Sequence, residues 1–166
     1  MENARSHLKL AAFSSDPFDP KSTFKSAAMQ SGAVLRGGSD TRAGTLTVGG
    51  AVTFGGDFSL EIPVDSECVG QVVVPGNLTL PSTAAALTVK VNAVADQVVR
   101  VRTADSVPVL TCSGTLANSG VAHVWSVVTD TPKRIDVSNA TVVLEGSSYV
   151  IKGMRSVNGG FVIILR

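Results

Sequence analysis

The chain has 166 residues, which is enough for one domain with a substantial hydrophobic core. Charged residues make up only 16% and the net charge is +1, so no broad basic field is available to attract nucleic acid, and we expect no nucleic-acid partner. Hydrophobic residues make up 44%, yet no run approaches the roughly 18 apolar residues that a membrane-spanning helix needs, so we expect no membrane span.

The first 43 residues lack the order of the rest of the chain. The pairs Asp16-Pro17 and Asp19-Pro20 predict turns, because the residue before proline is disfavoured in a helix. The segment Lys21–Gln30 predicts a short helix with apolar residues on one face. We therefore expect residues 1–43 to form an irregular leader or a cap, followed by one β domain over residues 44–166.

From Gly44 onward apolar residues alternate with threonine and small residues, which is the pattern of half-buried strands. Glycine and proline pairs punctuate the pattern and predict the turns between strands. The chain is therefore predicted to be all-β. The predicted strands cover residues 45–48, 51–54, 57–62, 71–74, 77–80, 86–91, 97–102, 107–111, 123–129, 134–137, 141–144, 148–152 and 161–165.

Two stretches of the chain repeat each other at a spacing of 26 residues. The first runs from Gly44 to Phe54 and the second from Gly70 to Leu80. When the two are aligned, glycines match glycines and apolar residues match apolar residues. If one additional residue is allowed between the two units, so that their spacing becomes 27 residues, Leu60-Glu61-Ile62 aligns with Leu87-Thr88-Val89. A period between about 20 and 50 residues indicates a unit that stacks on copies of itself.

The repeat favours a right-handed parallel β-helix, a solenoid with degenerate end coils, because stacked equivalent positions bury like residues in ladders. The short links between strands are also compatible with hairpins, so an antiparallel β-sandwich or jelly roll is the alternative. After residue 92 the repeat can be continued only with insertions.

The phrases Gly-Thr-Leu-Thr-Val-Gly-Gly-Ala-Val-Thr-Phe at residues 44–54 and Gly-Gln-Val-Val-Val-Pro-Gly-Asn-Leu-Thr-Leu at residues 70–80 resemble the autotransporter-associated β-strand repeat proteins. Residues 109–114 resemble the piece that commonly follows, and residues 161–165 would be a closing strand. The resemblance implies a passenger-type β-helix region of a bacterial surface or secreted protein. The N-terminus has no signal-peptide pattern, so we expect the chain to be secreted or displayed as part of a longer one. The family offers no catalytic residues to transfer.

The sequence gives little support to catalysis. Only His7 and His123 could serve as an imidazole base, and no serine lies in a Gly-x-Ser-x-Gly elbow. At the spacing of 27, Asp57 and Glu61 of the first unit face Ala84 and Thr88 of the second, so no ladder of acids forms. We therefore expect no enzyme, no catalytic residue, no cofactor and no resident metal.

Three further features have a structural and a functional interpretation. Cys68 and Cys112 are expected to be two buried free thiols, with a disulfide as the alternative. The loop Asp65-Ser66-Glu67 is expected to be a solvated turn, with Ca²⁺ binding as the less favoured alternative. Trp125 is expected to pack in the core, with stacking on a glycan as the alternative.

The predicted function is a non-enzymatic structural or adhesive module of an exported bacterial surface protein, with surface glycans or other surface proteins as partners. One alternative is a carbohydrate-binding or polysaccharide-cleaving β-helix module that uses Trp125 and the acidic loops. Another is a viral-type spike or jelly-roll structural protein. The oligomeric state does not follow from the sequence.

Overall fold

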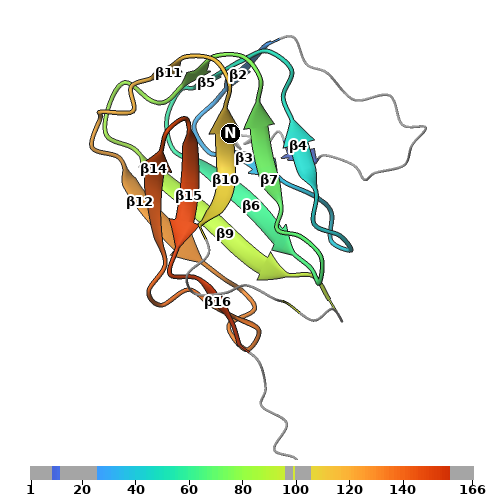
Figure 1. The fold of residues 1–166 in the computed structure, drawn as a ribbon. Helices are drawn as coiled ribbons and strands as arrows, with labels where there is room; N and C mark the ends of the chain where they lie inside the picture. Colours follow the sequence, from blue (N-terminus) through green and yellow to red (C-terminus); the bar gives the residue numbers. More distant parts are fainter. Residues whose placement is uncertain (1–8, 12–25, 96–98, 100–105, 158–166) are drawn as a thin grey trace, which may run out of the picture.

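A computed structural model describes residues 9–11, 26–95, 99 and 106–157. The described residues form β-strands joined by turns and contain no helix, which confirms the all-β prediction (Figure 1). Among them, therefore, no helix is long and apolar enough to cross a membrane. Most strands belong to one of three sheets, and a further pair joins β13 (Ile135–Asp136) to β16 (Arg155–Ser156).

We number the three sheets in the order in which the chain visits them from β4 onward. Sheet 1 has the strand order β14-β15-β10-β7-β4, sheet 2 the order β11-β8-β5-β2, and sheet 3 the order β1-β3-β6-β9-β12. The strands of sheet 1 are β4 (Thr45–Thr47), β7 (Gln71–Val74), β10 (Val107–Cys112), β14 (Thr141–Glu145) and β15 (Ser148–Lys152). Those of sheet 2 are β2 (Ser26–Met29), β5 (Ala51–Phe54), β8 (Leu78–Thr79) and β11 (Leu116–Ala117). Those of sheet 3 are β1 (Lys9–Ala11), β3 (Ala33–Arg36), β6 (Phe58–Val64), β9 (Ala86–Ala93) and β12 (Val124–Val128).

From β4 to β12 the chain visits sheets 1, 2 and 3 in that order three times. Each strand of the first two rounds pairs in parallel with the strand that occupies the same place in the next round. Parallel pairing between equivalent strands is not the arrangement of an antiparallel sandwich, so that alternative does not describe the strands from β4 to β12. Sheet 1 crosses in front of β6 and β9 of sheet 3 in Figure 1, and the space between the sheets holds the core.

The core consists of stacked apolar side chains, because the period-2 pattern of each strand turns alternate residues inward. Leu46 pairs with Val72, which pairs with Leu110, and all three side chains are buried. Phe58 pairs with Leu87 in the same way, and Leu87 pairs with Trp125 of the next round. Burial of each such aliphatic side chain stabilises the fold by about 1.5–3 kcal/mol.

The repeat of 26 residues is confirmed between β4 and β7 and between β5 and β8, where Leu46 pairs with Val72 and Val52 with Leu78. The predicted alignment at 27 residues is wrong, because Leu60 pairs with Val89 at a spacing of 29. Residues 80–85 between β8 and β9 form a longer link than residues 55–57 between β5 and β6. A shift of two residues leaves the same side chains facing inward, so the alternation alone could not distinguish the two registers.

The third round continues the sheets at a spacing of 38 residues, as in the pairs of Val72 with Leu110 and Thr88 with Ser126. Residues 94–106 between β9 and β10 form a longer link than residues 65–70 between β6 and β7. This insertion explains why the repeat fades in the sequence after residue 92. The predicted strand at residues 161–165, and all of the one at residues 97–102 except Val99, lie outside the described residues.

The helix predicted over Lys21–Gln30 is wrong where the structure describes it, because Ser26–Met29 forms strand β2. This strand pairs in parallel with β5, and Met29 is buried beside its partner Phe54. Sheet pairing thus overrides the modest helix propensity of the alanines in this segment. The nearby β3 likewise pairs with β6, so residues 26–36 extend sheets 2 and 3.

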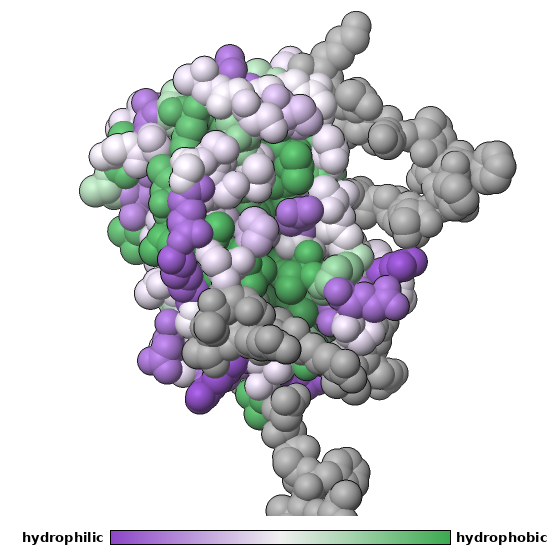
Figure 2. Space-filling model, in the orientation of Figure 1, coloured by the Kyte–Doolittle hydropathy of each residue, from purple (hydrophilic) through white to green (hydrophobic). Residues whose placement is uncertain are grey.

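At the other end the parallel arrangement of sheet 1 stops. Strand β15 pairs with β10 in the antiparallel direction, and β14 pairs with β15 as a hairpin. On the face of the molecule seen in Figure 2, hydrophilic residues form separate small groups among apolar and neutral ones. This distribution agrees with the low charge content of the sequence.

Candidate functional site

Trp125 lies on β12 with its ring directed toward the core. Its centroid is 4.8 Å from that of Tyr149 and 6.2 Å from that of Phe58, which it meets edge-on. The ring therefore joins sheet 3 to β15 of sheet 1, and aromatic pairs of this kind contribute about 0.5–1.5 kcal/mol beyond burial. Trp125 remains half-buried, so its contact with a glycan stays a prediction.

His123 lies just before β12 and is also half-buried. Neither ring nitrogen has a hydrogen-bond partner among the described residues. Without a nucleophile or a carboxylate bonded to the ring, the described surroundings of His123 do not form the base of a catalytic triad. His7 lies outside the described residues.

The loop Asp65-Ser66-Glu67 is built around a buried carboxylate, so the prediction of a solvated turn is wrong for Asp65. One oxygen of Asp65 accepts hydrogen bonds from the backbone N–H groups of Glu67 and Cys68, both at 2.8 Å, and the other accepts one from Ala43 at 2.9 Å. Burial raises the pKa of Asp65, but these backbone hydrogen bonds outweigh it, and the net effect lowers the pKa. Both oxygens are engaged by N–H donors, so the carboxylate closes the turn and is not arranged to hold Ca²⁺.

The two cysteines are free thiols, and the disulfide alternative is wrong. Cys112 is fully buried, as expected, and its Sγ lies 3.3 Å from the carbonyl oxygen of Gly76. Cys68 is exposed, which contradicts its predicted burial. Partial burial of the thiol and the neighbouring Asp65 carboxylate raise the pKa of Cys68.

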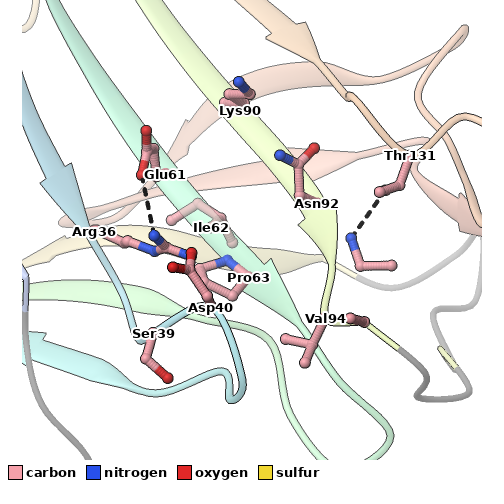
Figure 3. Close-up of a pocket in the computed structure, with 12 residues that line it drawn as sticks. Arg36, Ser39, Asp40, Glu61, Ile62, Pro63, Lys90, Asn92, Val94 and Thr131 are labelled. Carbon is pink, nitrogen blue, oxygen red and sulfur yellow. Dashed lines mark hydrogen bonds and ion pairs between the residues drawn. The ribbon is translucent and has the colours of Figure 1, made fainter.

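A row of charges crosses the outer face of sheet 3. Arg36 of β3 pairs in register with Glu61 of β6, which pairs with Lys90 of β9, so positive, negative and positive side chains lie side by side (Figure 3). Residues directly opposite each other on neighbouring strands have Cβ atoms about 4.5–5.5 Å apart. The row arises because these three positions face outward at the same level of the stacked strands.

Two acidic residues in loops, Asp40 and Asp130, form ion pairs with the two cations of the row. An Arg36 nitrogen lies 2.5 Å from a carboxylate oxygen of Asp40 and another lies 3.8 Å from one of Glu61. Lys90 Nζ lies 2.5 Å from a carboxylate oxygen of Asp130, which follows β12. The hydrogen bond from Lys90 lowers the pKa of Asp130; desolvation opposes it, and a hydrogen bond from Asn92 adds to the lowering.

A cleft of about 360 Å³ lies at the carboxyl ends of β3, β6 and β9, beside this row (Figure 3). Pro63 of β6 and Val94 supply apolar surface, whereas Ser39, Asn92 and Thr131 supply polar groups. The Thr131 hydroxyl accepts a hydrogen bond of 2.9 Å from the backbone N–H of Ala93, which ties the loop after β12 to β9. The full lining comprises Arg36, Ser39, Asp40, Glu61, Ile62, Pro63, Lys90, Asn92, Ala93, Val94, Ala95 and Thr131.

Sequence reasoning missed this cleft because it aligned the two units at 27 residues. That spacing placed Glu61 opposite Thr88, whereas the observed register places it opposite Lys90. Asp57 lies opposite Ala86, whose backbone N–H donates to its carboxylate at 2.8 Å. The three-residue insertion before β9 sets the observed register, and the alternation of apolar residues does not reveal its length.

The carboxylates of the cleft lie beside cations, and no group of three or more His, Cys, Asp or Glu side chains within the described ranges is arranged to hold a metal ion.

A scan against protein-family models finds no match to the chain. Comparisons with curated proteins and with solved structures find no significant match either.

Proposed function

We propose that the chain is a non-enzymatic structural module of an exported bacterial surface protein, built as a parallel β-helix that acts as a stalk or scaffold. The observation that carries the proposal is the in-register parallel pairing of equivalent strands in all three sheets. Connections between parallel strands are almost always right-handed, so we infer a right-handed coil. Each round then contributes one strand to each sheet and rests on the round before it.

The interior supports a structural role. Its ladders consist of aliphatic and aromatic side chains, and the buried polar side chain recorded among the described residues, Asp65, is used to close a turn. Stability in such an architecture is approximately a sum of terms for each round and its neighbours. The resemblance of residues 44–54 and 70–80 to autotransporter-associated β-strand repeats supports the same interpretation and points to display at a bacterial surface.

The structural proposal predicts that whole coils can be added. Three further copies of residues 44–69, inserted after Val69, should fold as additional rounds because each copy offers the same inward ladder positions. The longest dimension measured by small-angle scattering should then grow by roughly 14 Å, three spacings of about 4.8 Å between strands. Circular dichroism should show a proportional gain in β signal.

The control carries the same inserts with the residue order scrambled inside each copy. It keeps the length and composition but loses the alternation, so it should be unfolded in the insert or aggregate. Ordered and scrambled inserts that behave alike would exclude the solenoid. Display at the surface is tested separately, by antibodies against the chain, which should label intact cells of its source.

A further inference from the structure

The cleft on sheet 3 carries charges that neutralise one another. Both cations lie beside carboxylates, Arg36 beside Asp40 and Glu61, and Lys90 beside Asp130. The lining holds two cations, Arg36 and Lys90, and two carboxylates, Asp40 and Glu61, while the third carboxylate, Asp130, pairs with Lys90 from outside the lining. An anionic ligand would therefore meet at least as many carboxylates as cations, and a cationic ligand would compete with a guanidinium or an ammonium already in place. The electrostatics of the cleft therefore favour a ligand without net charge.

The same row of side chains selects a ligand that both donates and accepts hydrogen bonds. A guanidinium and an ammonium only donate, whereas an ionised carboxylate only accepts. Because Glu61 lies between Arg36 and Lys90 on neighbouring strands, donors and acceptors alternate across a short distance (Figure 3). A hydroxyl group does both, so a molecule with several adjacent hydroxyl groups matches the row.

The shape of the cleft sets the size of this molecule. Its volume of about 360 Å³ lies near the lower end of the range of about 300–1,000 Å³ that is typical of small-molecule sites. Pro63 and Val94 are largely buried, and the parts of them that line the cleft offer a limited apolar area against which the C–H face of a sugar ring can pack. Ion pairs hold Arg36, whose side chain is only 15% exposed, so little ordering remains to be done on binding.

We propose that this cleft binds a neutral oligosaccharide, with one or two sugar units seated between Arg36, Glu61 and Asn92. The inference goes beyond the structural role and does not depend on it, because a scaffold that binds no sugar would still stack its coils. It also places the sugar site away from Trp125, the residue for which the sequence raised glycan contact.

The test is binding of the purified chain to an array of neutral oligosaccharides built from glucose, galactose, mannose and N-acetylglucosamine. Sulfated oligosaccharides, uronate oligosaccharides and extended peptides are printed beside them. We expect hits confined to the neutral set, and calorimetry on the strongest hit should show at least a tenfold loss of affinity for Glu61→Gln. Lys90→Gln, which removes a donor from the same row, should show a similar loss.

The matched control is Glu145→Gln, because Glu145 is an exposed carboxylate paired with Lys152 outside the cleft. This variant should bind like the parent, and all variants should melt like the parent if the loss is local. The proposal is overturned by the absence of neutral hits, by a preference for acidic glycans or peptides, or by binding that survives both cleft substitutions. Binding lost in Trp125→Phe but kept in Glu61→Gln would also overturn it and would place the site on β12.

Discussion

Gly76 shows how closely one round lies on the next. A Cβ atom added at this residue would lie 2.3 Å from the carbonyl oxygen of Gly50, in the round before. A Cβ added at Gly114, one round later, would lie 2.6 Å from the carbonyl oxygen of Gly76. The corner between sheets 1 and 2 thus stacks three glycines, and backbone occupies the space that a side chain would need.

We therefore expect Gly76→Ala to destabilise the protein. The methyl group would meet backbone that cannot rotate away, and overpacking of this kind typically costs about 1–3 kcal/mol. Urea unfolding followed by circular dichroism measures the loss. Gly120→Ala is the control, because no atom lies within 4 Å of a Cβ built there, and its free energy of unfolding should stay close to that of the parent. Equal stability of the two variants would contradict the close stacking.

Residue patterns in the sequence predicted which side chains point inward but not which residues meet across strands. The glycines at positions 50 and 76 were matched correctly because no insertion separates them. Glu61 and Lys90 were not matched, because the longer link before β9 shifts the register by a number that alternation cannot reveal. The charge row depends on that register, so the pattern of apolar residues in the sequence could not predict the candidate site.

At the scale of elements, the pair of β13 and β16 includes an ion pair formed by the carboxylate of Asp136. Asp136 accepts a hydrogen bond of 2.9 Å from the backbone N–H of Ser138, and its other oxygen lies 2.8 Å from Nε of Arg155. These hydrogen bonds, those from Ser138 first and that from Arg155 next, lower the pKa of Asp136 to about 2. The pair is two residues long on each strand, and the ion pair between Asp136 and Arg155 adds to this short ladder.

The lowered pKa predicts a loss of stability in acid. The folded state binds the Asp136 proton less tightly than the unfolded state, so unfolding takes up a proton between the ordinary pKa of 3.8 and about 2. The contribution is fully present above pH 4 and is lost as the pH falls toward 2. Asp136→Asn should flatten the dependence of the free energy of unfolding on pH in this window, as measured by denaturation at several pH values. An unchanged slope would show that the hydrogen bonds of Asp136 do not persist in solution.

The elements that the sequence predicted correctly are those whose alternation is strong, such as β5, β7 and β10. The segment that became β2 has two adjacent alanines and no alternation of its own, so only its partner β5 makes it a strand. Strand β11 was missed for a related reason, because its two residues become a strand by pairing with β8. A local sequence pattern does not show whether a segment pairs with a strand that is distant in the chain.

At the scale of the whole molecule, we expect the two thiols to react under different conditions, Cys68 in the folded state and Cys112 on unfolding. Cys112 is fully buried in the core that all three sheets share, whereas Cys68 is exposed in a turn. We expect Cys68 to react with a thiol reagent in the folded state, slowly at neutral pH because its pKa is raised. In a Cys68→Ser variant, Cys112 should react only through unfolding of the whole domain, so its labelling rate should rise in parallel with unfolding as urea is added. Rapid labelling of Cys112 in water would show that the core opens locally.

The link between β9 and β10 is longer than the equivalent link one round earlier. It spans residues 94–106, whereas the equivalent link in the previous round spans residues 65–70, and the strands on both sides keep their parallel partners. Each doubling of such a loop costs only about 0.6 kcal/mol of closure entropy. The parallel pairing of β9 and β10 with their neighbours is therefore compatible with links of different lengths between successive rounds. The position between β9 and β10 is therefore where we expect new recognition sequences, acquired by evolution or grafted by design, to be accepted without a change of strand pairing.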